Sequence, residues 1–518
     1  MSEMNTLMAN FVKANTKTSS LLNNMKATTN YGYTENGGVK HNTTNSAVLD
    51  MFGQGGSMRN RSDADVIYMF KRAYEENPTY ALKCLFYLRD AREGAGERRF
   101  FRVCLKWLAQ HDLNAVLRNL EYVPEYGRYD DWFCLFDTPA EKAVLDLIKR
   151  QLITDIDAFN TPKAAVSLFA KWAPSINCSS KTTLAYAHKI VDYLGVSPKM
   201  YRKTLSALRE RIRVLERLMS QNRWEEIDFS KIPSRAGLIY SKSFLRHEEE
   251  RYRKFMSSKE TKVNAQVLTP YDIAHQIFNS HNPAQVDRQR WDKYWAGLKD
   301  YYCGRQENGI AVVDVSGSMS GRPMEAAVSM GAYIAERGKG PFRNHFITFA
   351  SNPALVEFSG IDTYDKFRRA TRANWGGSTN IEAVFDLLLQ TARKYHTPQK
   401  DMPQTIYIFS DMEFNRCITS GPSTQEDWWA ASHKVLDRQG IDTVIEAQMR
   451  KWKRYGYKAP RVIFWNLDAR HENIPALGDN FSYVSGFSMS MVETILGGKS
   501  GYDLMLEKLD SERYKVIH

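Results

Sequence analysis

The spacing of apolar residues changes near residue 305 and separates two regions of different structure. From about 61 to 300, apolar side chains recur three and four positions apart, as at Val66, Met69 and Phe70. This period is typical of amphipathic helices. Glycine and proline interrupt the pattern often, so we expect a stack of HEAT-like helical hairpins, although no repeat of fixed length is evident.

Residues 1–60 have a different composition, rich in Asn, Thr, Ser and Gly. Such a segment cannot bury a core by itself, so the sequence predicts an extended or partly disordered N-terminal arm. The apolar patch Val48–Phe52 is the one place where the arm could be fixed to the remaining chain.

Beyond residue 305, short apolar runs alternate with helical patterns, which predicts a mostly parallel, doubly wound α/β sheet. The expected strands are Ile310–Val313, His345–Phe349, Thr405–Phe409, Arg461–Trp465 and Tyr483–Val484. The expected helices are Met324–Glu336, Ile381–Lys394, a stretch near Glu426–Met449, Met489–Ile495 and Asp503–Leu509. We therefore expect a multidomain protein: the arm at 1–60, an all-α helical-repeat domain at 61–304 and an α/β domain at 305–518.

Composition places the chain among water-soluble globular proteins, with 43% apolar and 25% charged residues. No apolar run is long enough to span a membrane, and the first residues do not resemble a secretory signal. The six cysteines are scattered without a C-x-x-C pair. This favours a reducing, cytoplasmic location over a disulfide framework or a zinc site.

The positive charge is concentrated in the first part of the chain. Residues 1–300 hold 45 Lys and Arg against 34 Asp and Glu, whereas residues 301–518 hold 26 against 25. A surplus of this kind predicts attraction to a polyanion such as nucleic acid, although it could also serve solubility alone.

One predicted helix, Lys199–Met219, places several arginines along the flank of its apolar stripe, which forms a basic ridge. The ridge residues are Arg202, Arg209, Arg213 and Arg217. A solvated face with helix-surface ion pairs is the alternative interpretation. Aromatic residues interleave with the basic residues from 199 to 254, and this combination favours binding of single-stranded RNA.

Three loops add further candidate RNA contacts. The first surrounds a Gly-x-Gly turn, the second precedes Trp132, and the third is a short turn after Pro233. Their arginines are Arg89, Arg92, Arg98 and Arg99, then Arg128, then Arg235. Because acidic residues accompany the first two loops, ion-pair networks between helices explain those arginines equally well.

Hydroxyl and carboxylate side chains gather where the predicted α/β strands end. The residues are Asp314, Ser316 and Ser318 after the first strand, Thr379 before a helix, and Asp411 after Phe409. Ligands of doubly wound sheets bind at the carboxyl ends of the strands. Oxygen donors without His or thiol suit Mg²⁺, with Mn²⁺ or Ca²⁺ as alternatives.

These five residues match the complete metal-ion-dependent adhesion site (MIDAS) of von Willebrand factor type A domains, which residues 309–518 resemble. The resemblance implies coordination by Ser316 and Ser318, with Asp314, Thr379 and Asp411 acting directly or through water. It also implies a protein partner whose acidic residue completes the metal shell.

A basic helical region followed by such a domain resembles the Ro (TROVE-type) ribonucleoprotein group. Phrases typical of a Ro-like branch found in cells and large viruses are REGAGERR, VPEYGRYDDW, KWAPS, YRKTLSALRERI and PSRAGLIYSKSFLRHEEERY. This resemblance implies that the helical repeats close into a ring. It also implies that the protein is a monomeric ring or weak oligomer and binds small noncoding or misfolded RNA. Duplex RNA would lie on the outer basic surface, and a single-stranded end would pass through the ring.

Two other functional classes remain open. An enzyme is disfavoured, because Gly498-Lys499-Ser500 lacks the first glycine and the strand of a phosphate-binding loop, and the MIDAS pattern carries no general base. A metal-dependent nuclease stays possible. The second alternative is a scaffolding protein without nucleic acid, whose metal site captures an acidic residue of a partner.

Overall fold

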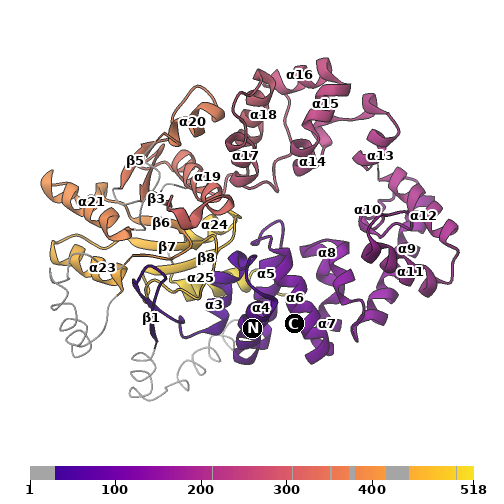
Figure 1. Cartoon of the computed structure of the whole chain (residues 1–518), viewed down its shortest axis with the longest axis horizontal. Coiled ribbons are helices and arrows are strands. Elements are labelled where there is room, and N and C mark those ends of the chain that lie inside the picture. The colour runs from indigo at the N-terminus through magenta and orange to yellow at the C-terminus, as the bar shows by residue number, and fades with distance from the viewer. Residues whose placement is uncertain are drawn as a thin grey trace.

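The computed structural model describes residues 30–212, 214–305, 307–349, 353–372, 380–415, 443–497 and 499–518. Helices follow an arc, and a sheet domain lies between the two ends of that arc (Figure 1). Among the described residues, none of the helices combines the length and the apolar character that crossing a membrane requires.

The arc is built from short helices with clear start signals. Ser62 caps the first helix in a reciprocal capping box with Asp65, and Asn77 caps the next helix, which begins at Pro78. The helices are α4 (Asp63–Glu76), α5 (Pro78–Arg89), α6 (Arg98–His111), α7 (Leu113–Asn119), α8 (Val123–Tyr126), α9 (Glu141–Asn160), α10 (Phe169–Trp172), α11 (Lys181–Leu194), α12 (Pro198–Arg211), α13 (Leu215–Ser220), α14 (Ser234–Ile239), α15 (Ser241–His247), α16 (Glu249–Ser257), α17 (Pro270–Phe278) and α18 (Gln285–Ala296).

The predicted helix Lys199–Met219 is wrong as a single element, because the chain breaks between α12 and α13. The amide of Val214 donates to the carbonyl of Arg209 at 3.2 Å, which ends α12. Helix α13 then turns so that Arg217 contacts Glu210 at 2.6 Å and the Ser206 hydroxyl at 2.7 Å. Arg217 therefore does not continue the face of α12 that carries Arg202 and Arg209, as it would in a single helix.

The described part of the N-terminal segment is folded, where an extended arm was predicted. Strands β1 (Tyr31–Tyr33) and β2 (Val39–His41) form a hairpin, and α3 (Ala47–Gln54) buries the Val48–Phe52 patch. Gly53 and Gly56, which follow this patch, permit close packing of this segment on the last strand of the sheet. A Cβ at Gly53 would lie 2.7 Å from the Cβ of Tyr483.

The sheet has six strands in the order β5-β4-β3-β6-β7-β8, parallel except for β5. The strands are β3 (Gly309–Asp314), β4 (His345–Phe349), β5 (Ala354–Glu357), β6 (Thr405–Ser410), β7 (Arg461–Asn466) and β8 (Phe481–Ser485). The helices are α19 (Arg322–Arg337), α20 (Thr363–Ala370), α21 (Ile381–Lys394), α23 (Val444–Arg454), α24 (Met491–Ile495) and α25 (Gly501–Leu509). Most of the expected Glu426–Met449 helix lies outside the described residues.

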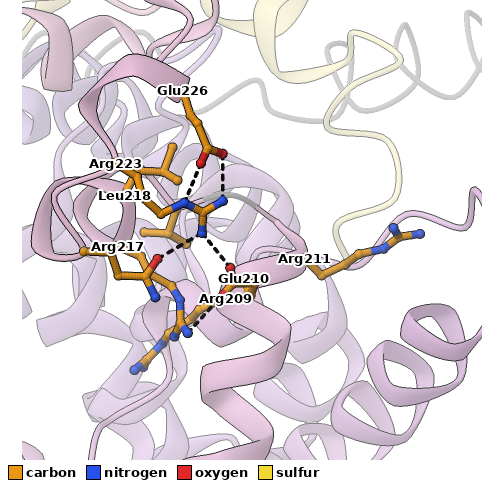
Figure 2. A pocket seen from close by; sticks show the side chains of 9 residues that line it. Arg209, Glu210, Arg211, Arg217, Leu218, Arg223 and Glu226 are labelled. Atoms are coloured by element: carbon orange, nitrogen blue, oxygen red, sulfur yellow. Dashed lines mark hydrogen bonds and ion pairs between the residues drawn. The ribbon is translucent and has the colours of Figure 1, made fainter.

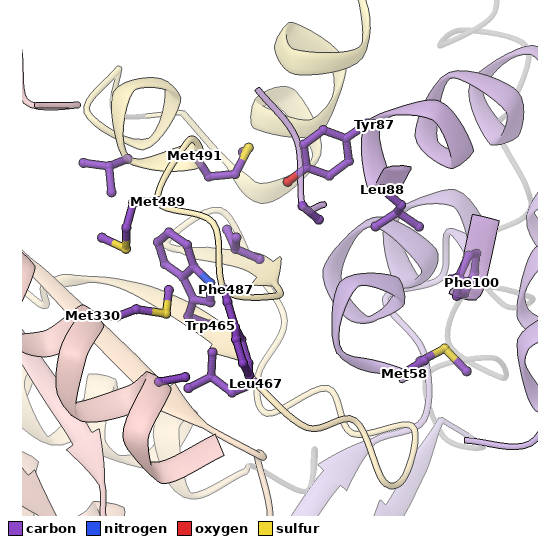
Figure 3. Packing of buried hydrophobic residues seen from close by; sticks show 14 of the residues in the cluster. Met58, Tyr87, Leu88, Phe100, Met330, Trp465, Leu467, Phe487, Met489 and Met491 are labelled. Carbon is purple, nitrogen blue, oxygen red and sulfur yellow. The ribbon is translucent and has the colours of Figure 1, made fainter. Parts of the chain in front are cut away.

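Both ends of the helical arc pack against the sheet domain. At one end α17 contacts α19 and α18 contacts α20, and at the other end α25 contacts α3 and α5. A single buried apolar cluster crosses the second junction, with Tyr87 and Leu88 on the helical side and Trp465, Phe487 and Met491 on the sheet side (Figure 3). The chain therefore forms a closed circuit of elements (Figure 1).

Residues near the C-terminus stabilise this second junction. Asp90, which is buried, accepts hydrogen bonds from the guanidinium of Arg513 and, at 2.9 Å each, from the Tyr514 hydroxyl and the Arg92 amide. These contacts raise the pKa of Arg513 above its ordinary range, chiefly through the hydrogen bond to Asp90. We call Asp90, Arg513 and Tyr514 the C-terminal clasp.

Candidate functional site

The predicted metal residues lie at the switch point of the sheet. From β3 the chain continues to β4 on one side, while β6 pairs with β3 on the other, so the loops after β3 and β6 diverge from adjacent strand ends. Ligand sites of open α/β sheets occur where loops diverge in this way. Asp314 ends β3, and Asp411 directly follows β6.

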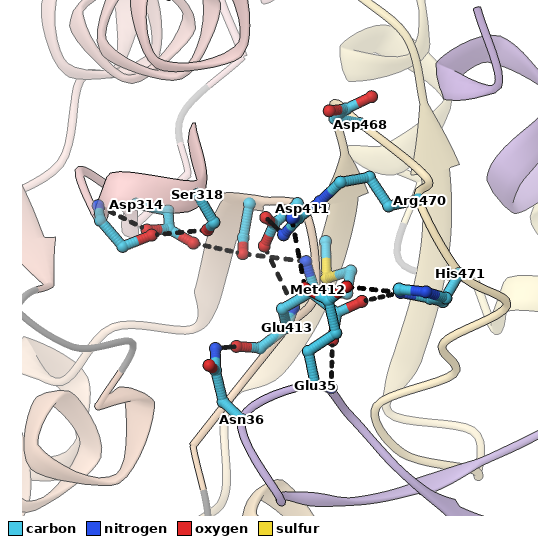
Figure 4. A network of polar contacts seen from close by, with 12 residues as sticks. Glu35, Asn36, Asp314, Ser318, Asp411, Met412, Glu413, Asp468, Arg470 and His471 are labelled. Atoms are coloured by element: carbon cyan, nitrogen blue, oxygen red, sulfur yellow. Dashed lines mark hydrogen bonds and ion pairs between the residues drawn. The ribbon is translucent and has the colours of Figure 1, made fainter. Parts of the chain in front are cut away.

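The loops after β3 and β6 bring several oxygen atoms into one network of polar contacts (Figure 4). Asp314 Oδ1 accepts the amide of Ser316 at 2.9 Å, and Asp314 Oδ2 accepts the hydroxyl of Ser410 at 2.6 Å. The hydroxyl oxygens of Ser316 and Ser318 are 3.0 Å apart. Two adjacent oxygens around one Mg²⁺ are separated by about 2.9 Å, given metal–oxygen bonds of about 2.0–2.1 Å.

Buried negative charge dominates this site. The pKa of Asp314 is raised to about 7, first by burial and second by the negative charge of Asp411. Hydrogen bonds from Ser316 and Ser410 act in the opposite direction. A divalent cation would stabilise both carboxylates, and the donors are all oxygen, so the described residues fit Mg²⁺. Thr379 lies outside the described residues, and its assignment stays a prediction.

Asp411 also has a partner that sequence reasoning missed. Arg470 Nη2 donates to Asp411 Oδ2 at 2.6 Å, and its Nη1 lies 3.2 Å from Glu35 Oε2. Asp411 Oδ1 accepts the amide of Glu413 at 3.1 Å. Arg470 belongs to the loop after β7 and Glu35 to the β1–β2 turn. No local pattern could have associated Glu35 or Arg470 with Asp411.

Several arginines predicted to contact RNA are bound to protein groups instead. Arg89 is the clearest correction: its side chain is 4% exposed and forms an ion pair of 2.7 Å with Asp131, so a phosphate cannot reach it. Arg128 pairs with Asp130 at 2.6 Å. Arg99 pairs with Asp63. The pairs of Arg89 and Arg99 join different helices, as the alternative of ion-pair networks between helices predicts, whereas Arg128 pairs within its own segment.

The arginines around the α12–α13 break are also largely engaged. Arg209 donates to the carbonyls of Ala170 and Ala173 at 2.8 and 3.0 Å. A pocket of about 250 Å³ lies here, and Figure 2 shows Glu210 and Glu226 binding Arg223 within it. Its lining residues are Arg209, Glu210, Arg211, Val214, Arg217, Leu218, Gln221, Arg223 and Glu226. The acids reduce its charge. Arg213 lies outside the described residues.

Other predicted contacts remain accessible. Arg92 and Arg235 pair with Glu125 and Asp272, yet their side chains are 53% and 66% exposed. Exposed cations without a hydrogen bond or ion pair to any described residue occur along the arc. They include Arg98 and Arg202, which the sequence singled out, and Lys203, Arg211 and Arg246, which it did not.

Comparison with known proteins identifies a relative that matches most of the chain. Uncharacterized protein L728 of Acanthamoeba polyphaga mimivirus is 32% identical over 511 residues, which cover 91% of this chain and 85% of the relative. This chain belongs to the family of the mimivirus protein. Two families described as domains of unknown function also match this chain. DUF2828 matches residues 34–127 and 179–298, and DUF7788 matches residues 308–515.

A solved structure also aligns with this chain along most of the chain's length. It is the RO (RSR) protein of Deinococcus radiodurans, aligned over 90% of this chain and 93% of its own, with 13% identity and a TM-score of 0.36. That similarity is too low to carry an argument about fold or function. The helix-rich first region and the sheet domain with parallel strands are observed directly in this chain.

Proposed function

We propose that this chain is a Ro-like RNA-binding protein whose α/β domain holds a Mg²⁺-dependent adhesion site for an acidic residue of a protein partner. The observation that carries the RNA part is a set of exposed cations on the helical arc, which includes Arg202, Lys203 and Arg211 and makes no ion pair with any described residue. Each of these side chains can bind a phosphate without first breaking an ion pair within the described part of the protein. The proposed function is binding, and it includes no catalytic step.

RNA binding would follow from charge neutralisation along the arc. Phosphate contacts release counterions, so affinity falls steeply as the salt concentration rises. Structured noncoding RNA is the proposed ligand class. The closed circuit of elements and the basic surplus of residues 1–300 support this choice over a scaffold without nucleic acid.

The adhesion part rests on the oxygen donors at the switch point. Asp314, Ser316, Ser318 and Asp411 would hold the cation, which would offer a coordination position to a partner's carboxylate oxygen. Ser410 orients Asp314 through its hydroxyl, and Arg470 holds Asp411 from the other side. Both contacts fix the carboxylates in place before a cation arrives.

The RNA proposal can be tested by charge reversal. Arg202→Glu, Lys203→Glu and Arg211→Glu together should weaken binding of a fluorescent RNA hairpin with a single-stranded tail by tenfold or more. The slope of log affinity against log salt should fall by about one for each phosphate that the variant no longer binds.

The matched control reverses three exposed cations of the α/β domain and changes the net charge equally: Arg343→Glu, Lys400→Glu and Lys458→Glu. Its RNA affinity should stay within about threefold of wild type. Equal weakening in both triple variants would show nonspecific attraction. A wild-type protein that binds no RNA at low salt would favour the scaffold.

The metal proposal has its own readout. Ser316→Ala should remove one equivalent of the Mn²⁺ bound by wild type, measured by electron paramagnetic resonance, whereas Ser320→Ala, whose hydroxyl donates to the Gly317 carbonyl, should bind as much Mn²⁺ as wild type. Wild-type RNA affinity in the Ser316→Ala variant would show that the two functions are separate. A number of bound Mn²⁺ ions that is unchanged from wild type in both Ser316→Ala and Asp314→Asn would refute the assignment of this site.

A further inference from the structure

Three side chains from distant parts of the sequence meet beside the switch point and belong to no site assigned above. Glu35 lies in the β1–β2 turn, Glu413 in the loop after β6, and His471 in the loop after β7. One potential ligand atom from each lies within 4.8 Å of the other two. Figure 4 shows the side chain of His471 directed toward Glu413.

The distances suit one small cation. His471 Nδ1 lies 2.9 Å from Glu413 Oε1 and 3.6 Å from Glu35 Oε1. A tetrahedral zinc site with bonds of about 2.0–2.1 Å places neighbouring donor atoms about 3.3 Å apart. The two observed separations fall on either side of that value, so small side-chain rotations would bring the donors to a common centre.

Glu413 is held in place for such a role. Its side chain is 1% exposed, and Oε1 accepts the Asn473 amide nitrogen at 2.6 Å while Oε2 accepts the Glu35 amide at 2.8 Å. Groups that bind a ligating carboxylate in this way fix its orientation. His471 is about half exposed, which leaves a path for an ion from solvent.

A second observation beside the three donors is a buried polar atom without a partner in the described part of the chain. Asn473 is 2% exposed, and its Oδ1 atom is buried without a hydrogen-bond partner among the described residues, although its other amide atom contacts Glu413. Buried amide oxygens are normally paired. The unpaired oxygen belongs to the side chain that binds Glu413, so a buried acceptor beside the cluster lacks a donor from the described ranges.

The charged side chains near Glu35, Glu413 and His471 also bind other groups, and the charge of His471 itself depends on pH. Arg470 contacts the other oxygen of Glu35, Oε2, and is shared with Asp411. Lys40 donates to the carbonyl of Glu472, and burial lowers its pKa. The buried Glu413 carboxylate pairs with the half-exposed His471, which is charged only when its imidazole is protonated. A metal ion would bind the neutral imidazole and supply the positive charge itself.

We propose that Glu35, Glu413 and His471 form a second metal site, for Zn²⁺, distinct from the oxygen-only site at Asp314. An imidazole together with carboxylates favours zinc over magnesium. Three protein ligands leave the fourth position to water.

The ion would fasten the N-terminal hairpin to the sheet domain. The hairpin already contacts the same loop, since Thr34 donates its hydroxyl to the Phe414 carbonyl at 2.6 Å and Asn36 donates to the Glu413 carbonyl at 2.6 Å. Glu35 is the one proposed ligand on the hairpin, and Glu413 and His471 are on the sheet side. Zinc binding should therefore slow opening of the hairpin.

Full-length protein with Ser316→Ala provides the background for the test, because the first site is then disabled. Titration with Co²⁺, a spectroscopic substitute for Zn²⁺, should give intense visible absorption at one equivalent, and Zn²⁺ should displace it. His471→Ala and Glu35→Gln should each abolish that absorption. Asn473→Ala should weaken binding by about 10–100-fold. His281→Ala, which removes another exposed histidine, is the matched control.

Hydrogen exchange gives a second readout. Zn²⁺ should slow exchange in residues 30–42 of the Ser316→Ala protein and of its His281→Ala control, with no such effect in the Glu35→Gln variant. Glu35 is exposed, so this variant should remain folded. Co²⁺ absorption that persists in both His471→Ala and Glu35→Gln, or the lack of any absorption in the parent protein, would overturn the proposal without affecting the Mg²⁺ assignment.

Discussion

Removing the Arg513 guanidinium should open the junction between the C-terminal segment and the first helices of the arc. Arg513 binds both oxygens of Asp90, whose side chain is 0% exposed, while Arg513 itself is 18% exposed. Arg513→Met keeps much of the apolar stem and removes the guanidinium, whose carbon atom lies 4.9 Å from the centroid of the Tyr126 ring. Asp90 would then stay buried with only Tyr514 and an amide as partners.

The magnitude follows from the burial of this pair. Removal of one partner from a buried ion pair costs about 3–5 kcal/mol. Because Arg513 is partly exposed and Asp90 keeps two donors, we expect the lower end, about 3 kcal/mol. That free energy corresponds to about a hundredfold faster local opening, since about 1.4 kcal/mol is a factor of ten.

Hydrogen exchange measured by mass spectrometry reports this opening directly. It avoids assuming that a chain of several domains unfolds in one step. The amides of residues 510–518 and of α5 should exchange about a hundredfold faster in Arg513→Met. Lys515→Met, which breaks an exposed pair with Glu512, should change exchange by less than about threefold.

Two outcomes would refute this reasoning. The first is an Arg513→Met protein whose C-terminal amides exchange within threefold of wild type. The second is additivity in the double variant with Asp90→Asn. Residues in direct contact should show a coupling energy of at least about 0.5 kcal/mol.

Two further predictions concern packing and pH. A Cβ at Gly331 would lie 2.3 Å from Val313 Cγ2, so Gly331→Ala should destabilise the sheet domain by about 1–3 kcal/mol in thermal unfolding, and adding Val313→Ala should restore much of that stability. A double variant as unstable as Gly331→Ala alone would contradict this. A hydrogen bond from Arg61, then one from Ser62, lowers the pKa of Asp65 to about 2, so its contribution is present above pH 4 and disappears toward pH 2. Asp65→Asn should therefore be less stable at pH 7 by up to about 1 kcal/mol, given this exposed site, and the difference should shrink below pH 4 in melts at several pH values.

Local patterns predicted most of the sheet domain. Its central strands are continuous apolar runs, because parallel strands are covered on both faces. The edge strand β5 was missed: only Val356 is buried in it, so the run Ala354–Glu357 gives no such signal. Strand ends also predicted that Asp314 and Asp411 would meet, since β3 and β6 are neighbours.

Contacts between distant segments could not be predicted in this way. The break after α12 is stabilised by the ion pair between Arg217 and Glu210. The helical spacing of apolar residues does not indicate that pair. The pairing of Arg470 with Glu35 joins residues at opposite ends of the chain. Composition likewise suggested an extended or partly disordered arm, because glycine can indicate either flexibility or close packing. At Gly53 it permits close packing.

The packing of α3 on β8 has a consequence for biosynthesis. The Gly56 amide donates to the Ser485 hydroxyl at 2.9 Å, a contact between residues 429 positions apart. While the ribosome synthesises the intervening helices, β8 does not yet exist, so the apolar face of α3 stays exposed to solvent. Because such non-local contacts form slowly and leave apolar surface exposed, we expect assembly to finish only after release, and chaperones would shield this face until then.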